Sequence, residues 1–223
     1  GFLTDIIAIS AGYTYTVALK DDGTVWTWGS NYDGQLGNGN NENSNTPVQV
    51  VGPNGEGFLT DIIAIAGGGA HTIALKEDGT VWAWGDNFLG QLGNGNNEDS
   101  NTPVQVVGPD GIGTLTEIIA IAAGTSHSIA LKDDGTVWTW GRNYDGQLGN
   151  ENNENSNTPV QVVGPNGEGF LTDIIDIAAG GFHSIALKDD GSVCTWGDNS
   201  LGQLGNGSSN NDSNIPVKVI YNG

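Results

Sequence analysis

Three histidines, His71, His127 and His183, recur 56 residues apart and are the side chains whose type and spacing come closest to a metal site. Imidazole nitrogens are common ligands of zinc, copper and iron, so equivalent histidines could converge on one axis. The first repeat carries Tyr15 at this place, which leaves such a ring of ligands incomplete. We therefore expect no metal, and we assign the three histidines to the structural framework.

Carboxylates recur at the same interval, and two together could serve as a general acid and a base. The pairs are Asp21-Asp22, Glu77-Asp78, Asp133-Asp134 and Asp189-Asp190. Each pair precedes a glycine, which is typical of a hairpin turn. Glycosidase carboxylates must face each other across a cleft in unlike environments, and four equivalent turns lack that asymmetry. We expect no catalytic residue and no enzyme activity.

An asparagine-rich segment, residues 38–45 and its counterparts, offers many side-chain oxygens. Calcium accepts such ligands, so a calcium site is an open alternative to a loop that satisfies its own hydrogen bonds. The segment lacks the spaced aspartates of the common calcium loop, and we expect no cofactor. The preceding Gly34-Gln35-Leu36-Gly37 has neither the lysine nor the spacing of a phosphate-binding loop.

The chain is strongly acidic, with 26 Asp and Glu against 6 Lys and Arg and a formal charge of −20. Nucleic acid and anionic membranes require a basic surface, so both are poor partners. The composition favours a bacterial extracellular or cell-surface setting, or otherwise a soluble protein. Cys194 stands where other repeats have tryptophan, and the absence of Met predicts a processed product or a piece of a longer protein.

The elements that must position these residues form a 56-residue repeat, with units at 1–56, 57–112, 113–168 and 169–223 in one domain. Four short segments in the first unit, residues 6–12, 15–20, 24–29 and 46–51, have the β-branched or alternating pattern of strands. The fourth begins near a proline, which predicts an edge strand. Four strands per unit with glycine-rich turns predict an all-β fold, a β-propeller or propeller segment of four four-stranded blades.

The repeated motif resembles the repeat of the regulator of chromosome condensation, including bacterial propeller-repeat proteins. The motif joins a Gly-x-x-His-Ser element to Trp-Gly and Gly-Gln-Leu-Gly, and its structural positions are Trp28, Gly34, Gln35, Leu36, Gly37, Trp84, Trp140, Trp196 and the three histidines. The resemblance implies four-stranded blades, usually seven in a ring, with sequence repeats offset from the blades. Four repeats leave three possibilities open: a closed four-bladed ring, a ring shared between chains, or an open arc.

Function is expected where near-identical repeats disagree, because exposed aromatic side chains on rigidly held loops are typical of protein-binding surfaces. The candidate binding residues are Tyr13, Tyr32, Asp33, Phe88, Leu89, Tyr144, Asp145, Phe182 and Leu201. We predict a non-catalytic protein-protein interaction module with an unknown protein partner. The alternatives are a building block that assembles head-to-tail into rings or filaments, as a homo-oligomer, and, less favoured, a guanine-nucleotide exchange factor.

Overall fold

The computed structural model describes residues 1–221 as four four-stranded antiparallel sheets, each formed by the strands of one repeat. The first sheet contains β1 (Ile6–Ala11), β2 (Tyr15–Lys20), β3 (Val25–Gly29) and β4 (Ser44–Gln49), and the second contains β5 (Ile62–Gly67), β6 (His71–Lys76), β7 (Val81–Gly85) and β8 (Ser100–Gln105). The third contains β9 (Ile118–Ala123), β10 (His127–Lys132), β11 (Val137–Gly141) and β12 (Ser156–Gln161), and the fourth contains β13 (Ile174–Ala179), β14 (His183–Lys188), β15 (Val193–Gly197) and β16 (Ser213–Lys218). The expected all-β fold of four blades is confirmed.

Within a blade the strands follow chain order, so β4 and its counterparts form one edge of each sheet. The expected fourth strand, residues 46–51, lies two residues too late, since β4 starts at Ser44 and includes Pro47. The missing proline N–H is tolerated because β4 pairs only with β3, and the register between them is already irregular. Three short 3-10 turns, η1 (Pro53–Gly55), η2 (Pro109–Gly111) and η3 (Pro165–Gly167), lie in the connectors between blades.

A tryptophan from each of the second, third and fourth blades packs against the preceding blade and closes the junction between them. Trp84 is fully buried in one cluster with Val25 and Leu36 of the first blade. Its indole Nε1 donates a 3.0 Å hydrogen bond to the main-chain oxygen of Gln35. Trp140 and Trp196 repeat this contact at 2.9 Å with the counterparts of Gln35. The core is therefore a row of junctions, in which the apolar face of each blade is buried only by its neighbour.

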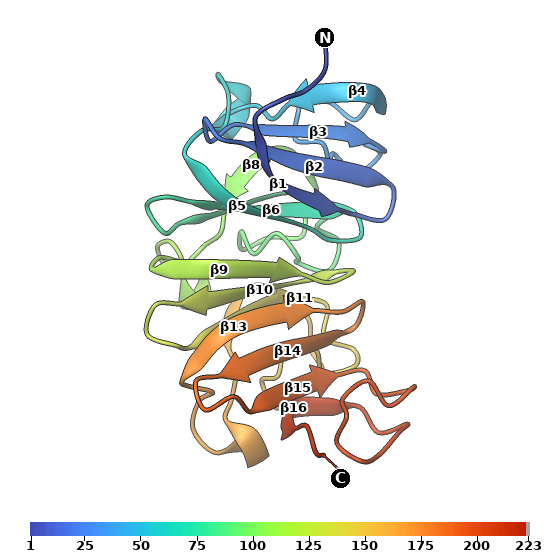
Figure 1. Ribbon diagram of the computed structural model, residues 1–223, viewed down its shortest axis with the longest axis vertical. Coiled ribbons are helices and arrows are strands. Elements are labelled where there is room, and N and C mark those ends of the chain that lie inside the picture. The colour runs from blue at the N-terminus through green and yellow to red at the C-terminus, as the bar shows by residue number, and fades with distance from the viewer. Residues whose placement is uncertain (222–223) are drawn as a thin grey trace.

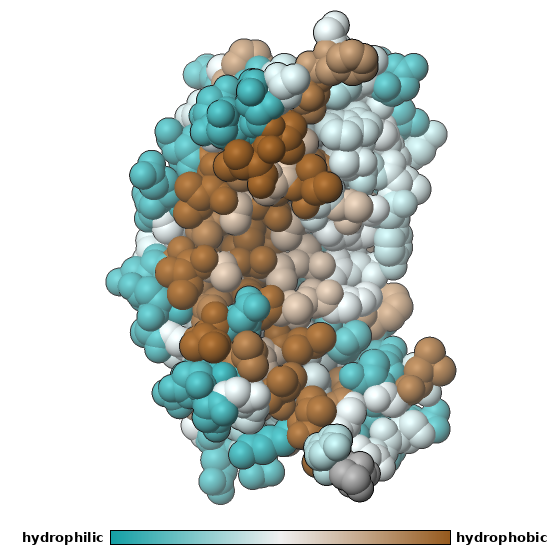
Figure 2. Space-filling model, in the orientation of Figure 1, coloured by the Kyte–Doolittle hydropathy of each residue, from teal (hydrophilic) through white to brown (hydrophobic). Residues whose placement is uncertain are grey.

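The four blades form an open arc, with the chain termini at opposite ends of the molecule (Figure 1). The first strands of successive blades, β1, β5, β9 and β13, contact one another along the inner side. Isoleucines on these strands remain between 54 % and 75 % exposed: Ile7, Ile9, Ile63, Ile119 and Ile175. They contribute to a hydrophobic strip that runs along the arc (Figure 2). Of the three possibilities left by the sequence, the closed four-bladed ring is not formed.

Two of the three histidines lie in the framework between blades, and the third, His183, is partly buried in the last blade. His71 and His127 are fully buried, and their Nε2 atoms are 3.0 and 3.1 Å from serine hydroxyls of the following blade. Burial lowers the pKa of His71 to about 4 and that of His127 to about 3, so both rings are neutral at pH 7. Tyr15 takes the equivalent place in the first blade and donates its hydroxyl hydrogen to the main-chain oxygen of His71.

Candidate protein-binding surface

The two ends of the blades differ in what they display. We call one end the loop face, formed by the turns between the first and second strands of each blade and the long loops between the third and fourth. The opposite end, the connector face, carries the hairpins between second and third strands and the connectors between blades. None of the helices among residues 1–221 is long and apolar enough to cross a membrane.

The long loops of the loop face are held rigid by one asparagine each. Asn31 is buried, and its Nδ2 lies 2.8 to 3.4 Å from four oxygens of residues 38, 40 and 42. Its Oδ1 accepts a 2.9 Å hydrogen bond from the main-chain N–H of Leu36, which sets the orientation of the amide. Asn87 and Asn143 repeat the arrangement. Oxygens that could have surrounded calcium are therefore turned toward an amide nitrogen.

The recurring carboxylate pairs lie on the connector face and serve their own turns. Asp22 accepts hydrogen bonds from the main-chain N–H and the hydroxyl of Thr24, at 3.0 and 2.6 Å. These bonds, that from the hydroxyl first, lower the pKa of Asp22. Asp78 and Asp134 make the same contacts. Such carboxylates are turn caps, each occupied by its own hairpin.

All the candidate binding residues lie on the loop face, and the most exposed of them are apolar or aromatic. The exposed fractions are 71 % for Tyr13, 75 % for Tyr32, 77 % for Phe88 and 91 % for Leu201. Tyr144 and Phe182 are also exposed, whereas Asp33, Leu89 and Asp145 are partly buried. The structure brings six of the nine candidates together in two groups, one beside the first blade and the other between the third and fourth blades.

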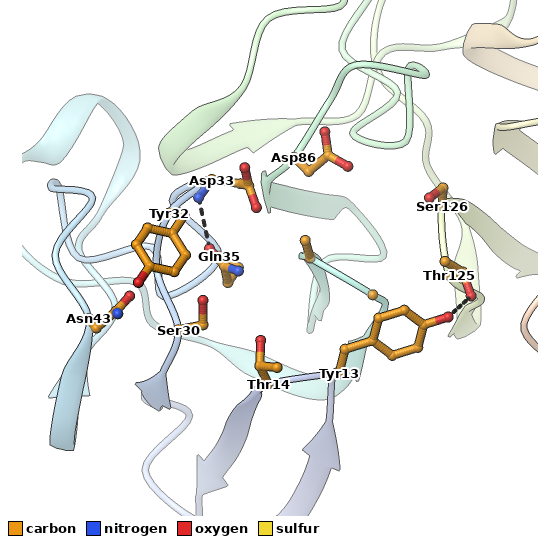
Figure 3. A pocket seen from close by; sticks show the side chains of 12 residues that line it. Tyr13, Thr14, Ser30, Tyr32, Asp33, Gln35, Asn43, Asp86, Thr125 and Ser126 are labelled. Carbon is orange, nitrogen blue, oxygen red and sulfur yellow. Dashed lines mark hydrogen bonds between the residues drawn. The ribbon is translucent and has the colours of Figure 1, made fainter.

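The first group lines a hollow of about 650 Å³ over the first three blades. Figure 3 shows the rings of Tyr13 and Tyr32 on opposite sides of it, with Asp33 and Asp86 along its rim. Tyr13 is fixed across the second blade, because its hydroxyl is 2.6 Å from Oγ1 of Thr125. The hollow is of a size that a ligand or an inserted side chain could fill.

The hollow has an acidic rim. Burial and, next, the negative charge of Asp99 raise the pKa of Asp33. Asp86 also has a raised pKa, mainly through burial and then through the charges of Asp99 and Asp33. Both carboxylates are partly buried and lie near other negative charges, so a bound cation would stabilise their ionised forms.

The second group surrounds Arg142. Its guanidinium forms an ion pair with Asp145. Its carbon Cζ lies 4.5 Å from the ring centroid of Phe182 and 5.3 Å from that of Tyr144. These are distances at which a cation is attracted to the face of an aromatic ring. The other predicted residues, Phe88, Leu89 and Leu201, do not line the first hollow.

Sequence reasoning missed several residues that shape these two groups. Thr14, Ser30, Asp86 and Ser126 line the hollow but were not among the candidates. One signal was available, because the place occupied by Ser30 in the first repeat holds Asp86, Arg142 and Asp198 in the others. It was a third divergent position in the same loop.

Comparison with known proteins agrees with the architecture. The family model of the RCC1-like domain matches residues 2–222. The ultraviolet-B receptor UVR8 of Arabidopsis thaliana is 36 % identical over 221 residues, 98 % of this chain and 47 % of the receptor. The human E3 ubiquitin-protein ligase HERC2 is 33 % identical over 206 residues, 92 % of this chain and 4 % of the ligase.

Solved structures show the same fold. Human WBSCR16 superposes with a TM-score of 0.81 at 27 % identity, over 97 % of this chain and 53 % of that protein. Prp20p of Saccharomyces cerevisiae gives a TM-score of 0.80 at 23 % identity, over 97 % and 50 %. The chain thus spans about half the length of these structures, and a much smaller part of the ligase. Because the match covers nearly all of its sequence and all four blades, the chain belongs to the RCC1-like domain family of β-propellers.

Proposed function

We propose that the chain is a non-catalytic protein-binding module whose partner docks on the loop face. The observation that carries this is the hollow between Tyr13 and Tyr32, set on loops that internal hydrogen bonds hold in place. Aromatic side chains on such a rigid support provide binding area at little cost in conformational entropy. RCC1-like domains typically serve as protein-interaction modules.

The connector face supports binding less well, although it also exposes apolar residues. Phe58 pairs with Val51 through an isolated β-bridge, and Phe170 makes the same contact with Val163. Thr114 makes the same bridge with Val107, so this main-chain contact recurs in each connector between blades. The loop-face aromatics have no such repeated contact, and their identities differ from blade to blade.

A matched pair of variants tests the proposal. The variant Tyr13→Ser/Tyr32→Ser/Phe88→Ser removes three loop-face aromatics, and Phe58→Ser/Phe170→Ser removes two exposed phenylalanines from the connector face. Proteins captured from the source organism would be identified by mass spectrometry, and binding would be measured by calorimetry with the purified partner. We expect the loop-face variant to lose binding at least tenfold and the control to keep it. Equal binding by the loop-face variant would place the partner elsewhere and refute the proposal.

A second role, assembly with further repeats, is favoured by the two ends of the arc. The fourth blade presents the main-chain oxygen of Gln203, the counterpart of the oxygens that accept the junction tryptophans. The first blade presents Trp28, whose counterparts are fully buried while it is partly exposed. These are the two complementary halves of one junction, which is the condition for a head-to-tail interface.

This second role predicts rings or filaments in which the first blade of one copy covers the fourth blade of another. Light scattering across a concentration series, with electron microscopy to count blades in each particle, tests it. A particle of one chain at all concentrations would contradict homo-oligomerisation. A guanine-nucleotide exchange role is the less favoured candidate, and a nucleotide-release assay would test it.

We propose the cellular location of the protein from its composition alone. The acidic, lysine-poor sequence favours a bacterial cell surface. The relatives described above are eukaryotic, from Arabidopsis thaliana, human and Saccharomyces cerevisiae, and lend no support to a bacterial or extracellular setting. Fractionation of the source cells, with detection of the chain in each fraction, tests it; recovery from the cytoplasm alone would refute it.

A further inference from the structure

The hollow beside the first blade and the cluster around Arg142 occupy equivalent places in the repeat. Residues 112 apart correspond between the first and third blades, as Tyr13 and Thr125 do. Tyr32 and Asp33 therefore correspond to Tyr144 and Asp145. The two sites share an aromatic ring and a carboxylate in the same loop geometry, so one can be compared directly with the other.

In the third blade this site is filled from within the chain. The guanidinium of Arg142 pairs with Asp145 and lies against the rings of Phe182 and Tyr144. Phe182 comes from the next blade, so the filled site closes the junction between the third and fourth blades. The arrangement combines a charge-assisted hydrogen bond with stacking on an aromatic face, and a planar guanidinium suits both contacts.

In the first blade the same site lacks both filling groups. Ser30 stands in the place of Arg142, and Ala70 of the next blade stands in the place of Phe182. Both small residues line the hollow, together with Tyr32 and Asp33. The hollow therefore exists because a guanidinium and a phenyl ring have been exchanged for a hydroxymethyl and a methyl group.

The acidic groups around the hollow have no cation of their own. Within residues 1–221 no hydrogen bond reaches the carboxylate of Asp33, and Asp86 accepts only from Phe88 and Gln91. Four lysines form ion pairs on the connector face with carboxylates of hairpins or connectors. The fifth, Lys218, ends the last strand at the same face. Arg142 is thus the one Lys or Arg side chain on the described loop face, and it is already paired.

We propose that this hollow binds an arginine side chain presented by the partner protein, in the place that Arg142 fills two blades away. The proposal rests on the protein-binding function above and names the chemistry recognised there. The guanidinium donates to the carboxylate of Asp33 and stacks on the ring of Tyr32. Asp86 adds negative charge from the second blade.

A titration with short peptides tests this inference without knowledge of the partner. The probe is an acetylated Gly-Arg-Gly amide, added to the isotope-labelled chain while amide chemical shifts are recorded. The controls replace arginine by lysine or by citrulline, a neutral residue of nearly the same shape. We expect shifts centred on Tyr32, Asp33 and Asp86, at least tenfold weaker binding of both controls, and at least tenfold weaker binding of the arginine peptide to Asp33→Asn.

Two paired variants make the test specific to the hollow. Ser30→Arg/Ala70→Phe copies the filled site into the first blade and should abolish peptide binding. Arg142→Ser/Phe182→Ala empties the site in the third blade and should create a second binding site, with shifts at Tyr144 and Asp145. In each variant, unchanged amide chemical shifts in the blades without substitutions show that the chain is still folded.

The outcomes separate this inference from the proposed function. Equal binding of the citrulline or lysine peptide, or unchanged binding by the filled variant, would overturn the arginine site. If the loop-face variant loses its partner while no arginine peptide binds, the inference fails and the protein-binding function stands. If arginine peptides bind while that variant keeps its partner, the proposed docking face fails and the arginine site is a separate one.

Discussion

The substitution Trp84→Phe measures how strongly one blade depends on the blade before it. Trp84 is fully buried at the junction of the first and second blades, with its indole N–H bonded to the main-chain oxygen of Gln35. Phenylalanine removes that bond, worth about 1 kcal/mol. It also removes the equivalent of roughly two buried methylene groups, at about 0.8 kcal/mol each. We expect the free energy of unfolding to fall by about 2.5 kcal/mol.

The chain supplies its own control for this substitution. Trp28 has the same place in the first blade, at one open end of the arc, and it is partly exposed. The change Trp28→Phe should therefore cost less than about 1 kcal/mol. Urea unfolding followed by far-ultraviolet circular dichroism would measure both, since that signal does not depend on tryptophan emission. Equal losses in the two variants would show that the tryptophan stabilises its own blade, and would refute the account of the junctions.

Three further predictions concern the framework. Burial holds the pKa of His71 at about 4, against 6.5 for a free histidine, so the unfolded chain binds more protons between these pH values and the free energy of unfolding falls as the pH drops from 6.5 to 4. In His71→Gln this fall should be smaller by up to about 3 kcal/mol, as measured by urea unfolding at several pH values. Gly37→Ala should lower the thermal unfolding temperature more than Gly39→Ala does, although both glycines have positive φ. A Cβ at Gly37 would lie 2.7 Å from the indole of Trp84, whereas a Cβ at Gly39 would meet nothing within 4 Å. Equal losses would contradict this prediction. Asn31→Asp should lower the free energy of unfolding by roughly 3 kcal/mol, because it replaces an N–H donor that is surrounded by oxygens with another oxygen. The control Asn45→Asp should change the free energy of unfolding by less than about 0.5 kcal/mol. If calcium restores the stability of Asn31→Asp, the loop can be converted to a metal site.

The fold could be predicted because each repeat encodes it independently. Alternation in β2 and the β-branched run in β1 define strands locally, and the 56-residue period multiplies the signal. The start of β4 was predicted two residues late, because the strand was expected to begin beside Pro47, whereas β4 contains this proline in its interior. The open arc could not be predicted, since the number of blades in a ring depends on contacts that no single repeat contains.

The candidate site was predicted only in part, for a physical reason. Tyr32 and Asp33 stood out because large side chains differ between repeats. The hollow itself depends on two small residues, Ser30 and Ala70, which lie far apart in the sequence and meet only at a blade junction. The divergence at the position of Ser30 was visible in the sequence, but the space opened by two small residues becomes visible only when both blades are in place.

The division between invariant and divergent positions follows from which contacts cross the junctions. Trp84 and Gln35 are used by two blades at once, so a change in one repeat disturbs its neighbour and the repeats stay alike. Contacts between loop-face residues do not recur at every junction, and two exchanges there distinguish the filled site at Arg142 and Phe182 from the open one at Ser30 and Ala70. A nearly uniform array can therefore carry one distinct binding site, because the scaffold fixes the geometry and a few loop residues decide which junction is left empty.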